Sequence, residues 1–419
     1  MPTAPAAEPA PAAVTHDRPT ADRPAAFWLV AGTTGTLLAA SSAPSPLYPV
    51  FQARFGFSAT MLTVIFAVYV LALLASLLTV GRLSDFVGRR PVLAGSLLVE
   101  AISMALFLAA TGTGWLLAAR AVQGLATGAA IGGLAAYLLD LQPAGGSRLG
   151  SLVNSVAPTA GLGVGAVGTG LLVQYGPAPT RLVFGLLAVL FVLLTGLTWV
   201  LPETVERVSG VLAALRPQVA VPAAARRPFL AAVPTMLATW GLGGLVLSVG
   251  GSLLGSVLGQ TNHAVVGALI GLFCAAGAVA SLAARDLTAE RMTGLGLWAL
   301  LAGTVLFLAA VLTGSVGVFV LAAAIAGAGF GTAFLGALRS VSRLAATHQR
   351  AALLSAVYLA SYLGFSIPAL VAGLVIPHAG LRDTCLGYGS FILLAAASAL
   401  ILRPGTESQP AIEEYLKSR

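Results

Sequence analysis

Two ionisable side chains, Glu100 and Arg120, each stand inside a long run of apolar residues. A carboxyl group in such surroundings can bind and release a proton, and an arginine there needs a partner or a water-filled cavity. The chemistry that this pair could support is therefore proton transfer. Glu100 could equally be a neutral, hydrogen-bonded acid that only packs its helix. The candidate partners of Arg120 are Glu100, backbone carbonyl groups and the carboxylate of a substrate.

The composition predicts the elements that position these residues. Of 419 residues, 58% are hydrophobic and 9% are charged, against about 25% charged in soluble domains. A bilayer core of about 30 Å requires roughly 20 apolar residues per helix. We therefore predict an all-α integral membrane protein with twelve spans, near residues 27–49, 59–80, 91–111, 114–139, 149–174, 181–201, 229–254, 264–284, 293–313, 316–338, 351–376 and 383–402.

Helix geometry then gives the depth of both ionisable groups. A rise of 1.5 Å per residue places Glu100 about 13 Å beyond Pro91, near the midplane, and Arg120 roughly 10 Å from the opposite surface. The two groups thus differ in level by about 8 Å, so direct pairing requires the arginine side chain to reach inward. A carboxylate at that depth costs on the order of 2.5 to 3.5 kcal/mol, which makes Glu100 a candidate proton carrier.

The distribution of basic residues predicts the orientation. Most of the 22 basic residues lie in the tails or in alternate loops, and they account for the net charge of +8. Because short cytoplasmic loops are enriched in Lys and Arg, both termini are predicted in the cytoplasm. The charge therefore indicates topology in a lipid bilayer and no nucleic-acid partner. We expect a monomeric multi-pass protein of the inner (cytoplasmic) membrane.

Changes in composition divide the chain into segments. Residues 1–25, rich in Pro and Ala, are predicted to be a disordered cytoplasmic tail. A polar stretch, 203–228, reads as a cytoplasmic linker that separates the spans six and six. The expected domains are an N-terminal six-helix bundle, 26–202, and a C-terminal six-helix bundle, 229–403. Residues 404–419 are expected to form a second cytoplasmic tail.

A charged decapeptide between the second and third spans carries the most specific pattern in the chain. It runs from Gly81 to Arg90 and contains Asp85, Gly88 and Arg89. Glycine permits a tight turn, Asp85 can cap a helix or pair with an arginine, and the arginines hold the loop in the cytoplasm. On physical grounds alone the loop could be only a topological anchor.

This order of glycine, aspartate, glycine and paired arginine resembles the signature loop between helices 2 and 3 of the major facilitator superfamily of secondary transporters. The stretch from Arg120 to Gly128, with Gln123 and Gly124, is similar to the motif on helix 4 of that family. The resemblance implies two six-helix bundles that rock about a central cavity. It also implies that Gly81, Asp85, Gly88, Arg89 and Arg90 form a latch between the halves that controls switching, and that Arg120 is tied to proton transfer.

Glycines on the fifth span add a second resemblance. Gly161, Gly165 and Gly170 are similar to the glycine pattern of proton-driven antiporters in this family, although Ala166 stands where that pattern has proline. Small residues let membrane helices approach closely. We therefore expect close helix packing at Gly124, Gly128, Gly161, Gly165 and Gly170.

The family's cavity is lined mainly by helices 1, 4, 7 and 10, and here these helices carry few polar groups. Each candidate for the cavity could also be a packing residue. A sugar site needs many amides and hydroxyls to replace water, and few are present inside the spans, so the lining favours a lipophilic or amphiphilic solute. The candidates are Gln123, Thr127, Asn154, Thr239, Trp240, Tyr358 and Tyr362.

Enzymatic functions find no support in the sequence. The four histidines fall in tails or predicted loops without metal-ligand spacing, and neither a catalytic triad nor a Walker motif is present. We expect no metal and no cofactor, with a proton gradient as the energy source.

The leading hypothesis is proton-coupled efflux of small hydrophobic or amphiphilic compounds, as in drug and multidrug antiporters. One alternative is proton-coupled uptake of an organic anion whose carboxylate binds Arg120. The alternative from another class is a membrane sensor or assembly partner that transports nothing.

Overall fold

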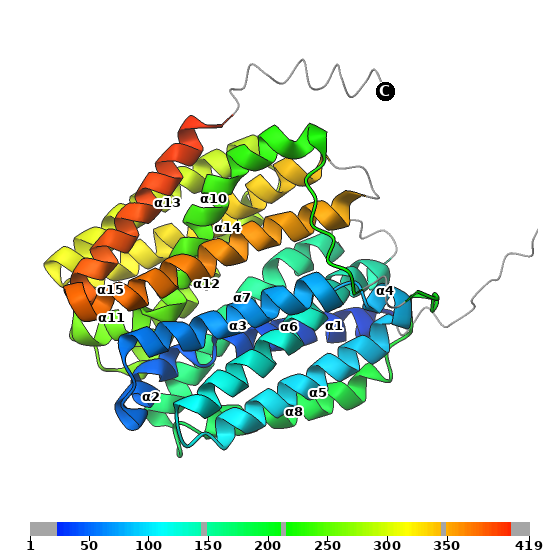
Figure 1. Cartoon of the computed structure of the whole chain (residues 1–419), viewed down its shortest axis with the longest axis horizontal. Helices are drawn as coiled ribbons and strands as arrows, with labels where there is room; N and C mark the ends of the chain where they lie inside the picture. The colour runs from blue at the N-terminus through cyan, green and yellow to red at the C-terminus, as the bar shows by residue number, and fades with distance from the viewer. Residues whose placement is uncertain (1–22, 144–148, 211–214, 345–348, 404–419) are drawn as a thin grey trace, which may run out of the picture.

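The computed structural model describes residues 23–143, 149–210, 215–344 and 349–403, which are built from helices and their connections (Figure 1). The predicted tails lie largely outside this part of the chain, at residues 1–22 and 404–419. The first helix starts at Arg23, inside the segment expected to be a tail. Likewise, the helix after the linker starts at Arg226 and not at residue 229.

The N-terminal half begins with a first span broken into three elements and continues with five long helices and one helix of four residues. Its elements are α1 (Arg23–Ser42), η1 (Ser45–Leu47), α2 (Tyr48–Phe55), α3 (Ala59–Val80), α4 (Ser84–Val87), α5 (Arg89–Leu108), α6 (Thr113–Leu141), α7 (Leu149–Tyr175) and α8 (Leu182–Thr198). The C-terminal half comprises η2 (Ala223–Ala225), α10 (Arg226–Ser248), α11 (Gly250–Ser256), α12 (His263–Ala283), α13 (Ala289–Thr313), α14 (Val316–Ser342) and α15 (Arg350–Ile401).

Local chemistry explains where these helices begin and end. Several start at a polar N-cap whose side chain accepts a backbone N–H bond from the first turn, as Ser58 does for α3 and Asn262 for α12. The apolar run of α13 ends at Gly314, which has the left-handed φ of 69°. In α15, Gly380 has φ 78° and ψ 163°, so this 52-residue element consists of two helices joined at a sharp break.

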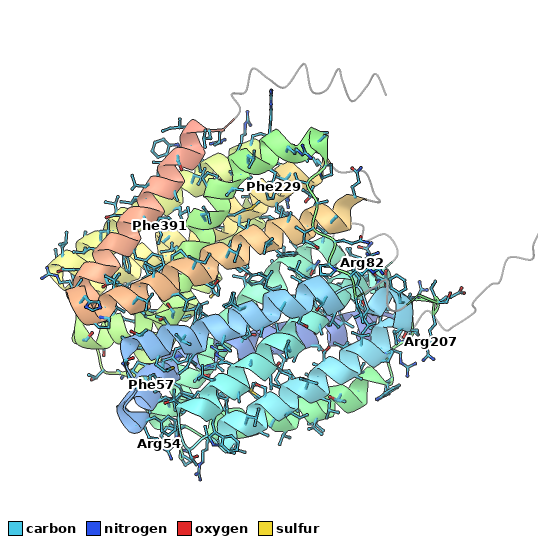
Figure 2. All side chains as sticks on the ribbon, in the orientation of Figure 1. Arg54, Phe57, Arg82, Arg207, Phe229 and Phe391 are labelled. Carbon is cyan, nitrogen blue, oxygen red and sulfur yellow. The ribbon has the colours of Figure 1, made fainter. Side chains whose placement is uncertain are left out.

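The helices account for twelve membrane crossings. In the described residues, ten helical segments have the length and hydropathy of a span, with α1, η1 and α2 counted together. One of the ten is the broken α15, which crosses twice, and the shorter apolar helix α8 supplies the remaining crossing. Figure 2 places Arg82 and Arg207 at one end of the molecule and Arg54 at the other. The end with Arg82 and Arg207 is assigned to the cytoplasm and the opposite end to the outside, because short cytoplasmic loops are enriched in Lys and Arg.

The two halves meet along two pairs of helices, α7 against α12 and α3 against α15. Hydrogen bonds across this boundary lie toward the outer end. Thr60 Oγ1 donates to the carbonyl of Gly373 at 2.6 Å, and the backbone N–H of His263 donates to Gln174 Oε1 at 3.0 Å. The outer end of the molecule is therefore closed.

The cytoplasmic end is hollowed by a cavity of about 720 Å³ between the same two halves. Ser151 of α7 lines it on one side. Thr288, at the start of α13, and Arg339 and Arg343, near the end of α14, line it on the other. A volume of this order is typical of small-molecule sites. The structure is thus open toward the cytoplasm.

Candidate functional site

Glu100 of α5 and Arg120 of α6 lie in one buried network, joined by Gln123. Their exposed fractions are 0% for Glu100, 1% for Arg120 and 0% for Gln123. Arg120 Nη1 donates to Gln123 Oε1 at 2.6 Å, and Gln123 Nε2 donates to Glu100 Oε1 at 3.1 Å. The side-chain amide of Gln123 accepts from Arg120 and donates to Glu100, so it bridges the difference in membrane depth between the two groups. Gln123, a candidate for the cavity, thus acts here as the link between the two charges.

The rest of the Arg120 guanidinium contacts the first span. Nε and Nη2 donate to the hydroxyl of Tyr48 at 2.9 Å and 2.5 Å, and Nη1 also donates to the Ser41 carbonyl at 3.0 Å. The guanidinium carbon lies 4.8 Å from the centre of the Tyr69 ring of α3, within cation–π range. Three helical elements besides its own helix, α1, α2 and α3, therefore hold this single arginine.

Sequence reasoning missed Tyr48 as a partner of Arg120. The chain brings it there through a break after α1, where Pro44 precedes η1 and Pro46 lies within it. Proline cannot continue a regular hydrogen-bonded helix, so the chain turns and α2 starts at Tyr48. The Pro-Ser-Pro-Leu-Tyr-Pro stretch marks the break in the sequence, but nothing in it indicates the partner.

The network can hold a proton at one defined atom. Glu100 Oε1 accepts from Gln123, whereas Oε2 is buried and has no hydrogen-bond partner among the described residues. A proton on Oε2 would leave the bond at Oε1 in place while removing the negative charge that faces Arg120. Protonation therefore changes the charge balance of the network without breaking its hydrogen bonds.

The cytoplasmic loop forms a second polar cluster around Arg89. Its guanidinium pairs with Asp85 at 2.6 Å and with Asp140 of α6 at 3.2 Å, and it donates to Ser84 Oγ at 3.0 Å. Asp85 thus pairs with an arginine and does not cap α5. These residues all belong to the N-terminal half.

The cap of α5 comes instead from the linker. The Glu203 carboxylate accepts the backbone N–H bonds of Arg89 at 2.8 Å and Arg90 at 3.1 Å. Gly88 has φ 107°, and a Cβ on it would lie 2.6 Å from Glu203 Oε2. Gly81, in contrast, has an ordinary helical φ of −56°. Of the two loop glycines, only Gly88 requires the conformational freedom of glycine.

Further contacts fasten the start of the linker to the loop. Arg90 donates to the Trp199 carbonyl and lies over the Trp199 ring, with 5.5 Å between the guanidinium carbon and the ring centre. The Val208 N–H donates to the Phe86 carbonyl at 3.0 Å. In the described part of the chain, the polar contacts of the loop stay within the N-terminal half and the linker. The loop expected as a latch between the halves is not engaged across them in this cytoplasm-open state.

Replacing Glu203 by Ala should destabilise the protein by about 1 kcal/mol, because two N–H groups at the start of α5 lose their acceptor. Thermal unfolding of the purified protein measures the effect. Glu206→Ala is the matched control, since Glu206 is an exposed carboxylate three residues further along the linker. Equal melting temperatures for the two variants would show that the cap contributes nothing.

The predicted packing glycines lie where helix backbones approach one another. A Cβ on Gly124 or Gly128 of α6 would lie 2.3 Å from a backbone carbonyl oxygen of α3. On α7, Gly161 and Gly165 face α1 in the same way, and Gly170 faces α12, with its Cβ position 2.6 Å from the His263 carbonyl oxygen. No side chain larger than hydrogen fits at these places without a shift of the backbone.

The remaining candidates for the cavity fall into different settings. Trp240 of α10 and Tyr362 of α15 are in contact, with 4.9 Å between ring centres, and Tyr358 lies 6.3 Å from Tyr362. Thr239 Oγ1 donates to the Thr235 carbonyl of its own helix at 2.7 Å and is fully buried. The structure therefore gathers the three aromatic candidates and leaves Thr239 outside their contacts.

Thr127 and Asn154 belong to the N-terminal half. Thr127 is fully buried on α6 beside Tyr69, and Asn154 is partly exposed on α7, one turn from Ser151 of the cytoplasmic cavity. Sequence reasoning missed the phenylalanines that complete the aromatic group around Trp240, namely Phe330, Phe334 and Phe365. Phenylalanine is too common in membrane helices for the sequence to distinguish these three residues.

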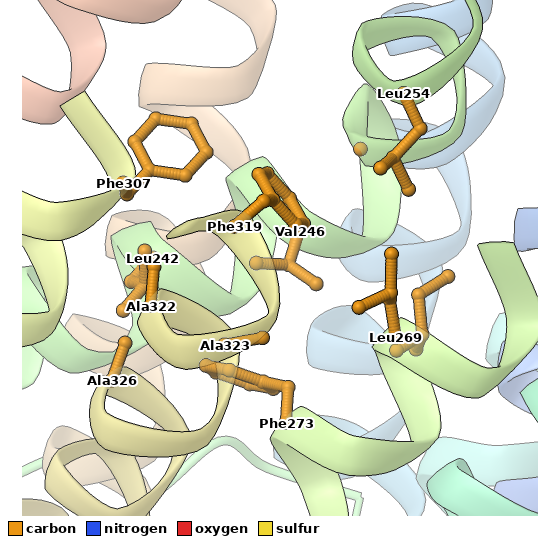
Figure 3. Close-up of a pocket in the computed structure, with 12 residues that line it drawn as sticks. Leu242, Val246, Leu254, Leu269, Phe273, Phe307, Phe319, Ala322, Ala323 and Ala326 are labelled. Atoms are coloured by element: carbon orange, nitrogen blue, oxygen red, sulfur yellow. The ribbon is translucent and has the colours of Figure 1, made fainter. Parts of the chain in front are cut away.

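A second, much smaller cavity lies inside the C-terminal half (Figure 3). Its volume is about 20 Å³, and its walls are apolar residues of α10, α11, α12, α13 and α14, among them Leu242, Leu254, Phe273, Phe307 and Phe319. This is space for one or two water molecules. The cavity is too small to be the site of a transported solute.

Comparison with known proteins identifies the fold. Residues 30–294 match the model of the Major Facilitator Superfamily. The chain belongs to the major facilitator superfamily. Solved structures of its members agree: a mutant of the nucleoside transporter NupG has a TM-score of 0.71 at 13% identity, covering 91% of this chain and 100% of its own.

Two further members of the family show the same architecture. The xylose transporter XylE from E. coli, in a partially occluded inward-open conformation, has a TM-score of 0.69 at 16% identity, covering 91% of this chain and 98% of its own. The human organic anion transporter MFSD10 has a TM-score of 0.62 at 19% identity, covering 91% and 100%. No curated protein sequence matches the chain. The family fold makes this a multi-pass membrane transporter of small molecules and not an enzyme.

Proposed function

We propose that the chain is a proton-coupled antiporter that exports small hydrophobic or amphiphilic compounds by alternating access. The observation that carries the proposal is the Glu100–Gln123–Arg120 network. Among the described residues, Glu100 is the only fully buried acidic side chain. An ionisable residue inside a membrane span marks a functional site by default, and buried carboxyl groups serve as proton relays in transporters. In this proposal, energy comes from the proton gradient and no cofactor takes part.

The cycle follows from the two states of Glu100. The cytoplasm-open state loads the solute through the cavity near Ser151. When Glu100 takes up a proton, the charge of Arg120 loses its counter-charge and keeps only its contacts with the uncharged groups of Tyr48, Ser41, Tyr69 and Gln123. Tyr48 lies on α2, which contacts α11, and Tyr69 lies on α3, whose Thr60 bonds to α15, so both elements form part of the closed outer boundary. Protonation thus acts on the elements that must separate when the molecule opens outward.

The proposal disfavours direct binding of an organic anion by Arg120. Its donors are already engaged by Tyr48, the Ser41 carbonyl and Gln123, and its side chain is 1% exposed. An incoming carboxylate would have to displace these bonds. The uptake alternative therefore requires a rearrangement that export does not.

A test of direction starts with a growth screen of cells that overexpress the gene against a panel of antibiotics and dyes, which selects the tracer compound. In everted vesicles with an acidic lumen, export predicts that entry of the tracer releases lumenal protons. Proton movement in the same direction as the tracer would indicate uptake in the cell. A sensor that transports nothing would move neither.

Replacing Glu100 by Gln should abolish proton movement coupled to the tracer while the protein remains expressed and folded. Glutamine keeps the hydrogen bond at Oε1 but cannot release a proton near neutral pH. Asp383→Asn is the control, because Asp383 is an exposed carboxylate at the outer side of the break in α15. Full proton-coupled transport by the Glu100 variant would remove this residue from the mechanism.

A further inference from the structure

Five aromatic rings of the C-terminal half form a cluster centred on Trp240. The indole meets Tyr362 at 4.9 Å, Phe334 at 5.3 Å, Phe365 at 5.5 Å and Phe330 at 6.3 Å between ring centres. All four contacts are edge-on, with interplanar angles of 63° to 81°. Edge-to-face contacts are the favourable geometry for aromatic rings. The indole is thus held in one orientation by α14 and α15.

This fixed indole has an unused hydrogen-bond donor. Its Nε1 is buried and has no hydrogen-bond partner among the described residues, although buried polar groups in proteins are generally paired. Indole nitrogen only donates, so the missing partner must be an acceptor. Trp240 itself is partly exposed, which leaves part of the ring accessible to another molecule.

The charges around the cluster favour some ligands over others. Aromatic clusters can bind cations, but the single fully buried carboxylate of the described residues, Glu100, is 0% exposed and hydrogen-bonded to Gln123. The contacts of the cluster lead toward a positive charge: Phe365 contacts Phe66 of α3, and Arg120 lies over the ring of Tyr69, one turn further along that helix. A cationic ligand would meet a like charge with no carboxylate available to offset it.

The cluster also reaches the boundary between the halves. Phe365 contacts Phe66 of α3, with 5.0 Å between ring centres. Trp240, Tyr362 and Phe365 therefore lie where a bound molecule would contact parts that must move apart during alternating access. A ligand here can favour one state over another.

We propose that the cluster around Trp240 binds the transported molecule, and that this molecule is a planar aromatic compound, uncharged or anionic, with an acceptor that pairs with the indole N–H. The inference rests on the proposed function only in taking the bound molecule to be the one transported. It does not depend on proton coupling or on the direction of transport.

Binding of three bicyclic probes to purified, detergent-solubilised protein tests the proposal without a gradient. Coumarin is planar and carries a carbonyl acceptor, naphthalene has no acceptor, and N-methylquinolinium is a cation of the same size. Equilibrium dialysis should rank coumarin first by about tenfold, the value of roughly one hydrogen bond. Trp240→Phe, which keeps a ring and removes the N–H, should abolish this advantage, so that coumarin and naphthalene bind with equal affinity.

The control variant is Trp298→Phe, because Trp298 lies on α13 with 64% of its surface exposed, and it should bind all three probes as wild type does. The proposal is overturned if wild-type protein binds coumarin no better than naphthalene, if N-methylquinolinium binds most tightly, or if Trp240→Phe retains the preference. The comparison of probes on wild-type protein decides the matter even if the variant does not fold. If the protein binds coumarin selectively but moves no protons in vesicles, the proposed antiport is contradicted and the binding site at Trp240 is not.

Discussion

Replacing Gly165 by Ala should destabilise the N-terminal half by about 3 kcal/mol and sharply reduce the yield of folded protein. The added Cβ would lie 2.0 Å from the Ala39 carbonyl oxygen and 2.5 Å from Ser42 Oγ. Neither atom can withdraw easily, because one belongs to the backbone of α1 and the other donates to the Leu162 carbonyl at 2.7 Å. The two helices would have to separate. Size-exclusion chromatography and thermal unfolding of the purified protein measure the effect.

Gly168 provides the matched control on the same helix. It lies one turn from Gly165, and a Cβ there would meet nothing within 4 Å. Gly168→Ala should therefore behave as wild type or be slightly more stable, since alanine favours helix over glycine. Similar losses for both variants would mean that helix propensity, and not the contact with α1, decides the outcome.

Replacing Arg120 by Lys should sharply reduce transport even though the positive charge is kept. A lysine ammonium is a point charge without the planar fork of arginine, so it cannot reach Tyr48, the Ser41 carbonyl and Gln123 at once. Each buried acceptor that loses its hydrogen-bond donor destabilises the protein by about 1 to 3 kcal/mol. Because the variant loses a few hydrogen bonds, we expect transport to fall by at least about tenfold and the melting temperature to decrease.

The tracer assay in vesicles and thermal unfolding measure the two effects of this substitution. Arg181→Lys is the control, because Arg181 is an exposed arginine at the outer end, before α8. Normal transport by Arg120→Lys would show that only the charge matters, and the hydrogen-bond network described above would then have no role in the cycle.

The fold could be predicted from the sequence because hydrophobic length alone defines a membrane span. The stretch 59–80 corresponds to α3 at Ala59–Val80, and 149–174 to α7 at Leu149–Tyr175. Interruptions were harder to foresee. The predicted span 229–254 is divided at Val249 into α10 and α11, where Ser248 and the pair Gly250 and Gly251 flank the break without a proline to mark it.

The charged residues of the candidate site could be predicted from the sequence, but the residues that they bond to could not. Glu100 and Arg120 stand out because ionisable groups are rare in spans. Tyr48 lies 72 residues from Arg120 in sequence, and Glu203 lies 114 residues from Arg89. Contacts over such separations depend on which helix faces pack together, which apolar periodicity does not reveal in helices that are hydrophobic all round.

The glycine contact between α7 and α12 has a mechanical consequence. Gly170 and Gly267 bring the two backbones together in the outer half of α7. The cytoplasmic end of that helix, at Leu149, lies about 32 Å below Gly170 at 1.5 Å per residue. With so close a contact acting as a pivot, α7 works as a lever, and a tilt of about 15° at the pivot would sweep the far end through roughly 8 Å. Modest angular motion at the outer end is thus amplified into closure of the cytoplasmic entrance beside Ser151.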